Sequence, residues 1–183
     1  MEINDLVTKL LKQSLSLFQP QKEFKNDTSF FERKFIAELS KKLQKNEKWI
    51  VVNECPYPEE SSGHPLADMY IETKGLKVWV EFKPLVKGFK YWSKSKFFNG
   101  DVNQTSDSIV LNDIDKVEFV IDDEDYFIFL MFLDTSGDES KRRLKSDRVF
   151  SLVDKRTKKQ KGCNFEYKTE KVGNEGRFYA FYT

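Results

Sequence analysis

The chain of 183 residues has little cysteine, no long apolar run and almost no net charge. Its only cysteines, Cys55 and Cys163, are too few for a disulfide framework or a cysteine-based zinc site, so we expect reduced thiols and a cytoplasmic protein. No apolar stretch approaches the roughly 20 residues that span a bilayer, and the acidic start Met1-Glu2-Ile3-Asn4-Asp5 is unlike a signal peptide. We therefore expect no membrane partner.

The formal net charge of +1 does not by itself indicate a nucleic-acid-binding protein. The charges are, however, segregated along the chain. Residues 83–98 hold five lysines and no acid, residues 113–125 hold seven acids and one lysine, and residues 141–161 hold ten basic residues and two acids. Such segregation can build a basic face on a nearly neutral protein. The basic run 141–161 fits either contact with a nucleic-acid backbone or a solvated loop.

Hydrophobic residues make up 39% of the chain and include 17 phenylalanines, which is enough for a core. Apolar spacing predicts helices over residues 3–15, 29–46 and 102–117. Proline and glycine mark a long loop over 56–65. Strands are predicted over residues 49–52, 67–72, 76–83, 126–133, 149–153, 164–168 and 177–182.

The segments around Lys74-Gly75 predict a hairpin with a two-residue turn. This turn pairs apolar residues on one face, namely Ile71 with Val78, Met69 with Val80, and Ala67 with Phe82. A three-residue turn would shift the register by one residue and place Asp68 opposite Val80. The apolar matching favours the two-residue turn.

In that register Asp68 lies opposite Glu81, with Cβ atoms about 5 Å apart, and Lys83 projects from the same face. Two facing carboxylates destabilise a sheet unless a cation compensates for them. Hard oxygen ligands of this kind suit Mg²⁺ or Mn²⁺. The other interpretation is a solvated hairpin face on which Lys83 only neutralises Glu81.

Glu32 falls inside the apolar stripe of the second helix, which is formed by Phe31, Phe35, Ile36, Leu39 and Leu43, whereas Glu38 falls on its flank. A carboxylate in a buried stripe needs a partner, because an unpaired buried charge is costly. Ser29-Phe30-Phe31-Glu32 is also a capping-box sequence, in which Glu32 would bond back to the Ser29 amide. Both interpretations remain open.

Taken in order, Glu32, Asp68 and the triplet Glu81-Phe82-Lys83, with twelve residues between Asp68 and Glu81, resemble the PD-(D/E)xK nuclease superfamily. This is the restriction endonuclease-like fold, and the resemblance covers residues 29–117. One position departs from the family pattern. The proline that usually precedes the first acid is replaced by Ala67, and the nearest proline is Pro65.

The resemblance implies an α/β (α+β) fold with a central mixed β-sheet flanked by helices. We expect one domain over residues 1–183, with an N-terminal helix and loop (1–28), the core (29–117), and C-terminal strands (118–183) that complete or extend the sheet. It also implies a metal-dependent nuclease that hydrolyses phosphodiester bonds, most simply a DNA endonuclease.

In such an enzyme Mg²⁺ or Mn²⁺ would be held by Asp68, Glu81, the backbone carbonyl of Phe82, and Glu32. Lys83 would orient the attacking water or stabilise charge in the transition state. Gln104 on the following helix is placed to aid the site, as a glutamine does in some family members.

The stretch after the second hairpin strand offers contacts to nucleic acid. Its lysines can neutralise phosphates and its aromatic residues can stack on bases; they are Lys87, Lys90, Tyr91, Trp92 and Lys94. The same aromatic residues also fit a core with a lysine rim. His64, the single histidine, fits either a contact to the scissile phosphate or metal, or an exposed loop residue.

Three classes of function remain in competition on the sequence. The first is an active nuclease on DNA rather than RNA, with a homodimer as the simplest way to cut both strands. The second is a catalytically inactive nucleic-acid-binding module on the same fold. The third is an interaction domain with no role at nucleic acid.

Overall fold

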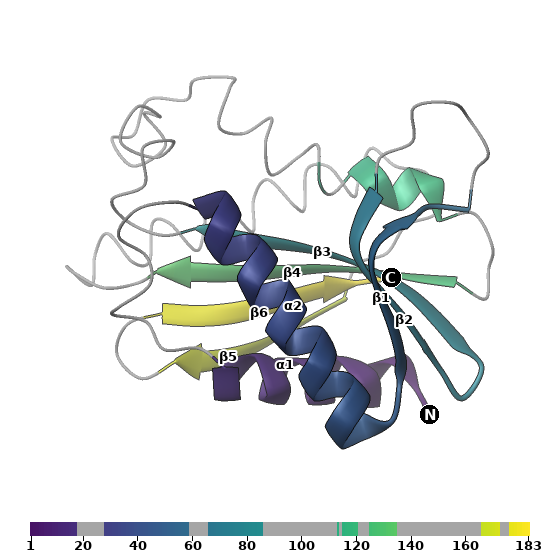
Figure 1. The fold of residues 1–183 in the computed structure, drawn as a ribbon, viewed down its shortest axis with the longest axis horizontal. Helices are drawn as coiled ribbons and strands as arrows, with labels where there is room; N and C mark the ends of the chain where they lie inside the picture. Colours follow the sequence, from purple (N-terminus) through teal and green to yellow (C-terminus); the bar gives the residue numbers. More distant parts are fainter. Residues whose placement is uncertain are drawn as a thin grey trace.

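The computed structural model describes residues 1–17, 28–58, 66–85, 113, 115–120, 125–134, 166–172 and 176–183. Within these residues the chain is an α/β structure with two α-helices, a short 3-10 helix and an open six-stranded mixed sheet (Figure 1). The elements are α1 (Ile3–Leu17), α2 (Thr28–Glu47), β1 (Ile50–Pro56), β2 (Leu66–Thr73), β3 (Leu76–Leu85), η2 (Lys116–Phe119), β4 (Asp125–Asp134), β5 (Glu166–Val172) and β6 (Gly176–Tyr182). None of the described helices is long and apolar enough to cross a membrane.

The sheet has the strand order β1-β2-β3-β4-β6-β5. Only β3 and β4 run parallel, and all other neighbouring strands are antiparallel, so the expected mixed sheet is confirmed. β4 lies inside the sheet, and its residues from Phe127 to Phe132 are all buried. Burial on both faces explains why this strand is a continuous apolar run rather than an alternating one.

The β2–β3 hairpin has the predicted two-residue turn. Lys74 and Gly75 both have positive φ values, 43° and 84°, a backbone that matches the twist of the two strands. Five residue pairs then follow in the predicted register, from Thr73–Leu76 at the turn to Met69–Val80. The apolar pattern along the strands therefore predicted the register next to the turn. The predicted pairs Asp68–Glu81 and Ala67–Phe82 are not part of the ladder, which ends at Met69–Val80.

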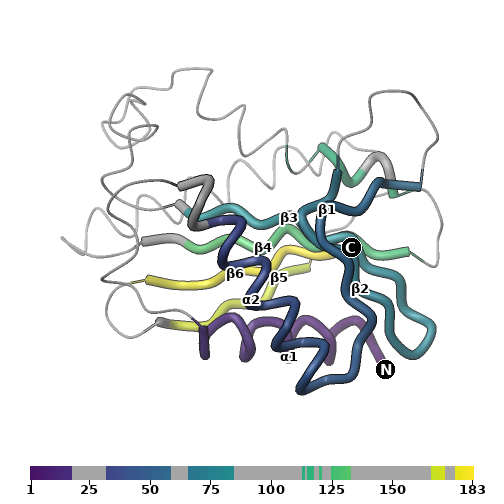
Figure 2. The backbone as a smooth tube through the Cα atoms, viewed as in Figure 1, coloured from purple at the N-terminus to yellow at the C-terminus, as the bar shows by residue number. Residues whose placement is uncertain are grey.

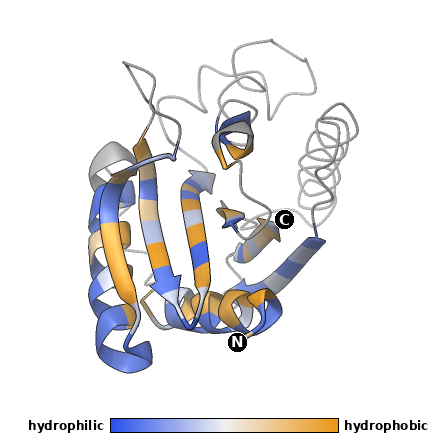
Figure 3. Cartoon of the chain, turned by 90° about the vertical axis from the view of Figure 1, so that its right-hand side faces the viewer, coloured by the Kyte–Doolittle hydropathy of each residue, from blue (hydrophilic) through white to orange (hydrophobic). Residues whose placement is uncertain are grey.

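Both helices pack on the same face of the sheet. α2 contacts β1, β2 and β3, and α1 contacts β5 and β6 (Figures 1 and 2). Hydrophobic and hydrophilic residues alternate along the strands in Figure 3, as expected for strands with one face toward these helices. Phe35 of α2 stacks on Phe82 of β3, with ring centroids 4.4 Å apart, and so ties the helix to the centre of the sheet.

Some predicted boundaries are wrong. β1 continues to Pro56 instead of ending at Val52, and β3 continues through Pro84 to Leu85 beside β4. Pro84 is tolerated because β2 no longer pairs with β3 there, so the missing N–H removes no bond on that side. The predicted strand 149–153, most of the helix 102–117 and most of the loop 56–65 lie outside the described residues.

Candidate active site

The site begins where β2 and β3 part. Their pairing ends at Met69–Val80, and the next residue along β2 is Asp68. The Phe82 backbone N–H donates a 2.7 Å hydrogen bond to Oδ2 of Asp68. The Asp68 carboxylate thus accepts from β3 where a backbone carbonyl would otherwise continue the ladder. Burial raises the pKa of Asp68 above its ordinary value, and the bond from Phe82 only partly offsets this.

Glu81 is almost completely buried, and both of its carboxylate oxygens are occupied. The Tyr57 hydroxyl donates to Oε1 at 2.6 Å, and the Lys116 ammonium lies 2.7 Å from Oε2. Burial and the neighbouring charge of Asp68 raise the pKa of Glu81 to about 8, because together they outweigh the attraction of Lys116. Glu81 therefore holds a proton more readily than an ordinary glutamate.

Lys83 does not pair with Glu81. Its Nζ lies 3.0 Å from Oδ2 of Asp113 and 3.4 Å from Oε1 of Glu32. Burial lowers the pKa of Lys83, but the attraction of Asp113 and Glu32 outweighs that effect, so the net pKa is above its ordinary value. Lys83 is thus a fixed cation at the site, and the counter-ion of Glu81 is Lys116 instead.

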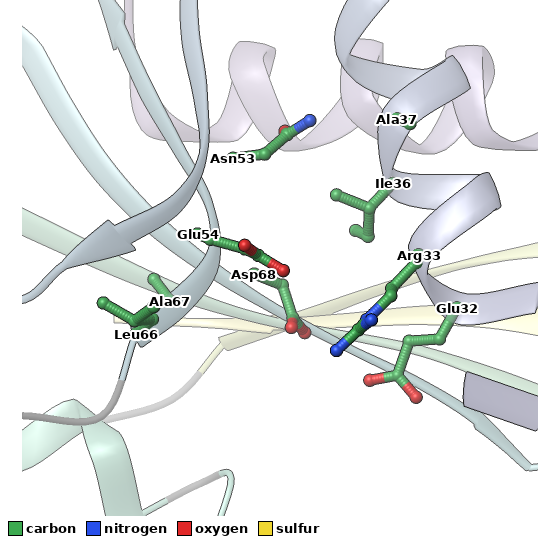
Figure 4. Close-up of a pocket in the computed structure, with 9 residues that line it drawn as sticks. All are labelled: Glu32, Arg33, Ile36, Ala37, Asn53, Glu54, Leu66, Ala67 and Asp68. Carbon is green, nitrogen blue, oxygen red and sulfur yellow. The ribbon is translucent and has the colours of Figure 1, made fainter. Parts of the chain in front are cut away.

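Glu32 reaches this site from the first part of α2. Figure 4 shows its carboxylate extending toward the region where the Asp68 and Arg33 side chains also end. α2 begins at Thr28, so Ser29 lies within the helix rather than at the N-cap position that the capping box requires. Burial raises the pKa of Glu32 to about 7, against the opposing attraction of Lys83. The structure shows the Lys83 ammonium as the partner of the Glu32 carboxylate.

Asp113 and Lys116 join the site, and sequence reasoning missed both as members of it. Lys116 Nζ lies 3.6 Å from Oδ1 of Asp113, so charges alternate from Glu32 through Lys83, Asp113 and Lys116 to Glu81. The sequence does contain a feature that sets these two residues apart. Lys116 is the only base within an acidic run, and it stands three residues after Asp113, the spacing of neighbours on a helix.

The donor set matches a divalent cation in chemistry and charge, but not in the spacing of its acids. Four carboxylates (Glu32, Asp68, Glu81 and Asp113) surround two ammonium groups (Lys83 and Lys116), which leaves two formal negative charges when all are ionised. Asp113 Oδ2 is buried and accepts no well-oriented hydrogen bond, although it is ion-paired with Lys83. However, no three His, Cys, Asp or Glu side chains of the described residues lie close enough together to hold a metal ion.

A pocket of about 580 Å³ opens beside Asp68, between α2 and the strands β1 and β2 (Figure 4). Its lining residues are Glu32, Arg33, Ile36, Ala37, Asn53, Glu54, Leu66, Ala67 and Asp68. Arg33 is exposed and forms no ion pair with any residue that the structure describes. Glu54 faces the pocket from a left-handed backbone with φ of 51°, at the one place where the β1–β2 pairing is interrupted opposite Asp68. Backbone strain of this kind is concentrated at functional sites.

Several predicted site residues lie outside the described part of the chain. They are His64, Lys87, Lys90, Tyr91, Trp92, Lys94 and Gln104. The predicted residues that are described, Glu32, Asp68, Glu81 and Lys83, gather in one region with Tyr57, Asp113 and Lys116.

Comparison with known proteins adds no relative. The chain matches no family model, and no curated protein or solved structure is significantly similar to it.

Proposed function

We propose that the chain is a metal-dependent nuclease of the PD-(D/E)xK type, which hydrolyses phosphodiester bonds and acts as an endonuclease on DNA. The observation that carries the proposal is the buried cluster at the point where β2 and β3 part. There Asp68, Glu81 and Lys83 of the hairpin meet Glu32 of α2, with more carboxylates than ammonium groups. Burying several carboxylates close together costs stability, and such clusters are typical of catalytic sites.

Asp68, Glu81, the Phe82 carbonyl and Glu32 would hold Mg²⁺ or Mn²⁺. When bound, such an ion polarises the phosphate and lowers the pKa of a water molecule. The chain's own groups prepare that environment. The Phe82 N–H orients Asp68, and the Tyr57 hydroxyl orients Glu81. Carboxylates fixed in this way need little reorganisation when a cation binds.

Lys83 would stabilise negative charge on the phosphate during hydrolysis. Its ammonium is held between Asp113 and Glu32, which keep it protonated and limit its movement. A preorganised cation of this kind contributes more than a mobile surface lysine, because the site is largely shielded from water. Asp113 acts here as a positioning residue.

The pocket beside Asp68 gives the substrate a way in. Arg33 presents a guanidinium there that forms no ion pair with a described residue and whose planar fork matches a phosphate. Ile36, Ala37 and Leu66 provide apolar walls against which a sugar or base can pack. A strand lying in this pocket would pass its backbone along Asp68.

A second candidate is the inactive nucleic-acid-binding module. The observation that favours it is that the lysines separate the carboxylates, so that no three acids of the described chain form a metal-binding group. In this function Lys83 and Lys116 would neutralise the acids permanently. The two candidates differ in cleavage but share binding to nucleic acid.

The test is cleavage of supercoiled plasmid, single-stranded DNA and RNA with Mg²⁺ or Mn²⁺. We expect DNA cleavage by the wild type and a loss of at least about 100-fold in Asp68→Asn and in Lys83→Ala, since the first removes a proposed metal ligand and the second removes the cation proposed to stabilise the phosphate. Glu38→Ala is the matched control, because Glu38 lies on α2 but is exposed, and among the described residues its ion-pair partner is Lys41. An inert wild type that still shifts DNA in a gel would support the binding module, and no cleavage and no binding would refute both.

A further inference from the structure

Among the described residues, Lys116 forms the shortest ammonium–carboxylate contact of the site, although it belongs to neither the hairpin nor α2. Its Nζ lies 2.7 Å from Oε2 of Glu81, closer than either contact of Lys83. Only 20% of its side chain is exposed. A buried ammonium is costly unless carboxylates surround it, so its position depends on Glu81 and Asp113.

This contact uses the oxygen that a metal ion would need. Oε1 of Glu81 already accepts from Tyr57, and Oε2 faces the Lys116 ammonium. An ammonium and a divalent cation compete for the same carboxylate lone pairs. An ammonium 2.7 Å from Oε2 also repels a divalent cation at the same oxygen, so metal binding to Oε2 of Glu81 is favoured when Lys116 moves away.

We propose that Lys116 competes with the metal ion for the carboxylate of Glu81. Its ammonium occupies the cation position at Glu81 in the metal-free protein and moves away from Glu81 when the metal binds. The second contact of Lys116 lowers the free-energy cost of this exchange. Its Nζ is already 3.6 Å from Oδ1 of Asp113, so it can leave Glu81 without losing every carboxylate partner. The affinity for the metal is then set by the strength of the Glu81–Lys116 pair.

The same arrangement explains why the described carboxylates form no three-acid group. Lys83 separates Glu32 from Asp113, and Lys116 separates Asp113 from Glu81. Of these two lysines only Lys116 contacts a carboxylate of the hairpin. Lys83 is thus a neighbouring charge for the metal, whereas Lys116 is a direct rival for its ligand.

The inference rests on the proposed function, and Mn²⁺ titration without nucleic acid tests the two separately. Binding is measured by calorimetry for the wild type, Lys116→Met, Lys83→Met and Lys41→Met. At pH 9, where protons compete least for Glu81, we expect Lys116→Met to bind Mn²⁺ about tenfold more tightly than the wild type, a coupling of ordinary size. Lys83→Met also removes one nearby positive charge, so its gain should be smaller, and the exposed Lys41→Met should bind like the wild type.

Thermal melting supplies a readout that does not depend on activity. Removing Lys116 leaves Glu81 without its ammonium, so metal-free Lys116→Met should melt lower than the wild type, and saturating Mn²⁺ should restore most of the difference. Lys116→Gln, which keeps a donor for Glu81, guards against a variant that does not fold. Wild-type binding with no gain in either Lys116 variant beyond that of Lys83→Met would overturn the inference alone. Absence of Mn²⁺ binding in every variant would overturn the inference together with the metal-dependent function.

Discussion

Phe82 and Glu81 are neighbours on β3, yet they face opposite sides of the sheet and contribute in opposite ways. Phe82 is completely buried and stacks on Phe35 beneath α2. Glu81 is nearly as buried, but it is a carboxylate held by Tyr57 and Lys116. Burial of the ring stabilises the fold, whereas burial of the carboxylate opposes it. One strand thus carries a residue that stabilises the core and, next to it, a site residue whose burial destabilises the fold.

The largest expected effect lies on the core side. Phe82→Ala should lower the free energy of unfolding by about 3–5 kcal/mol, because it removes a fully buried ring and leaves a cavity beneath Phe35. Phe82→Leu keeps most of the volume and should cost clearly less. Urea unfolding followed by circular dichroism measures both. Equal losses in the two variants would show that the packing of the ring is not what stabilises this strand.

On the site side, the stability of the metal-free protein should fall as the pH rises. The pKa of Glu81 is raised to about 8 and that of Glu32 to about 7, both above the 4.5 of an ordinary glutamate. Between these values the folded protein keeps protons that the unfolded chain has released, so each increase in pH favours unfolding. The melting temperature should drop by roughly a few degrees between pH 5 and pH 8.

Glu81→Gln should flatten this pH dependence, because glutamine does not titrate. Glu38→Gln, at an exposed position, should leave the slope unchanged. A melting temperature that rises through the same interval would mean that the Lys116 pair outweighs burial at Glu81. Saturating Mn²⁺ should weaken the fall with pH, since a bound metal favours the ionised carboxylates.

A smaller effect is expected at Tyr57. Tyr57→Phe removes the hydroxyl that donates to Oε1 of Glu81 and should cost about 1–2 kcal/mol of stability, as for a hydrogen bond to a buried carboxylate. The lost bond also favours the protonated form of Glu81, so Mn²⁺ binding should weaken several-fold. Calorimetric titration at pH 7 and at pH 9 checks this. Loss of affinity that persists undiminished at pH 9 would argue against a protonation effect.

The smallest effect is expected at Arg33, which is exposed and forms no ion pair with a described residue. Arg33→Ala should leave stability unchanged and raise KM for a DNA oligonucleotide about tenfold with little change in kcat, because a lost phosphate contact weakens binding of the ground state and transition state alike. Lys45→Ala removes the same charge at an exposed position farther along α2. Equal changes in the two variants would indicate only a general charge effect.

Patterns of apolar residues within single segments predicted the hairpin register and the buried side of α2. The alternation around Lys74-Gly75 fixed the hairpin register, and the apolar stripe of α2 identified its buried side. The carboxylate in that stripe, Glu32, has the cationic partner that its burial requires, namely Lys83.

Tyr57, Asp113 and Lys116 escaped prediction for a physical reason. Lys116 meets Glu81 across 35 residues and Tyr57 meets it across 24 residues, so their contacts depend on how whole segments return to β3. No periodicity in the sequence reports such a return. The partner of Lys83 was open for the same reason, because the competing acid Asp113 lies outside the hairpin.

The hydrogen bond from the Phe82 N–H to Asp68 places two separate demands on position 68. The side chain there must be an acceptor for the sheet to keep its shape, and it must be an acid for the proposed chemistry. Under the proposed function, a descendant of this chain that lost activity would still be selected to keep an acceptor at position 68, and asparagine would meet that demand as well as aspartate. An acid at position 68, rather than any acceptor, would then distinguish active copies of this protein from inactive ones.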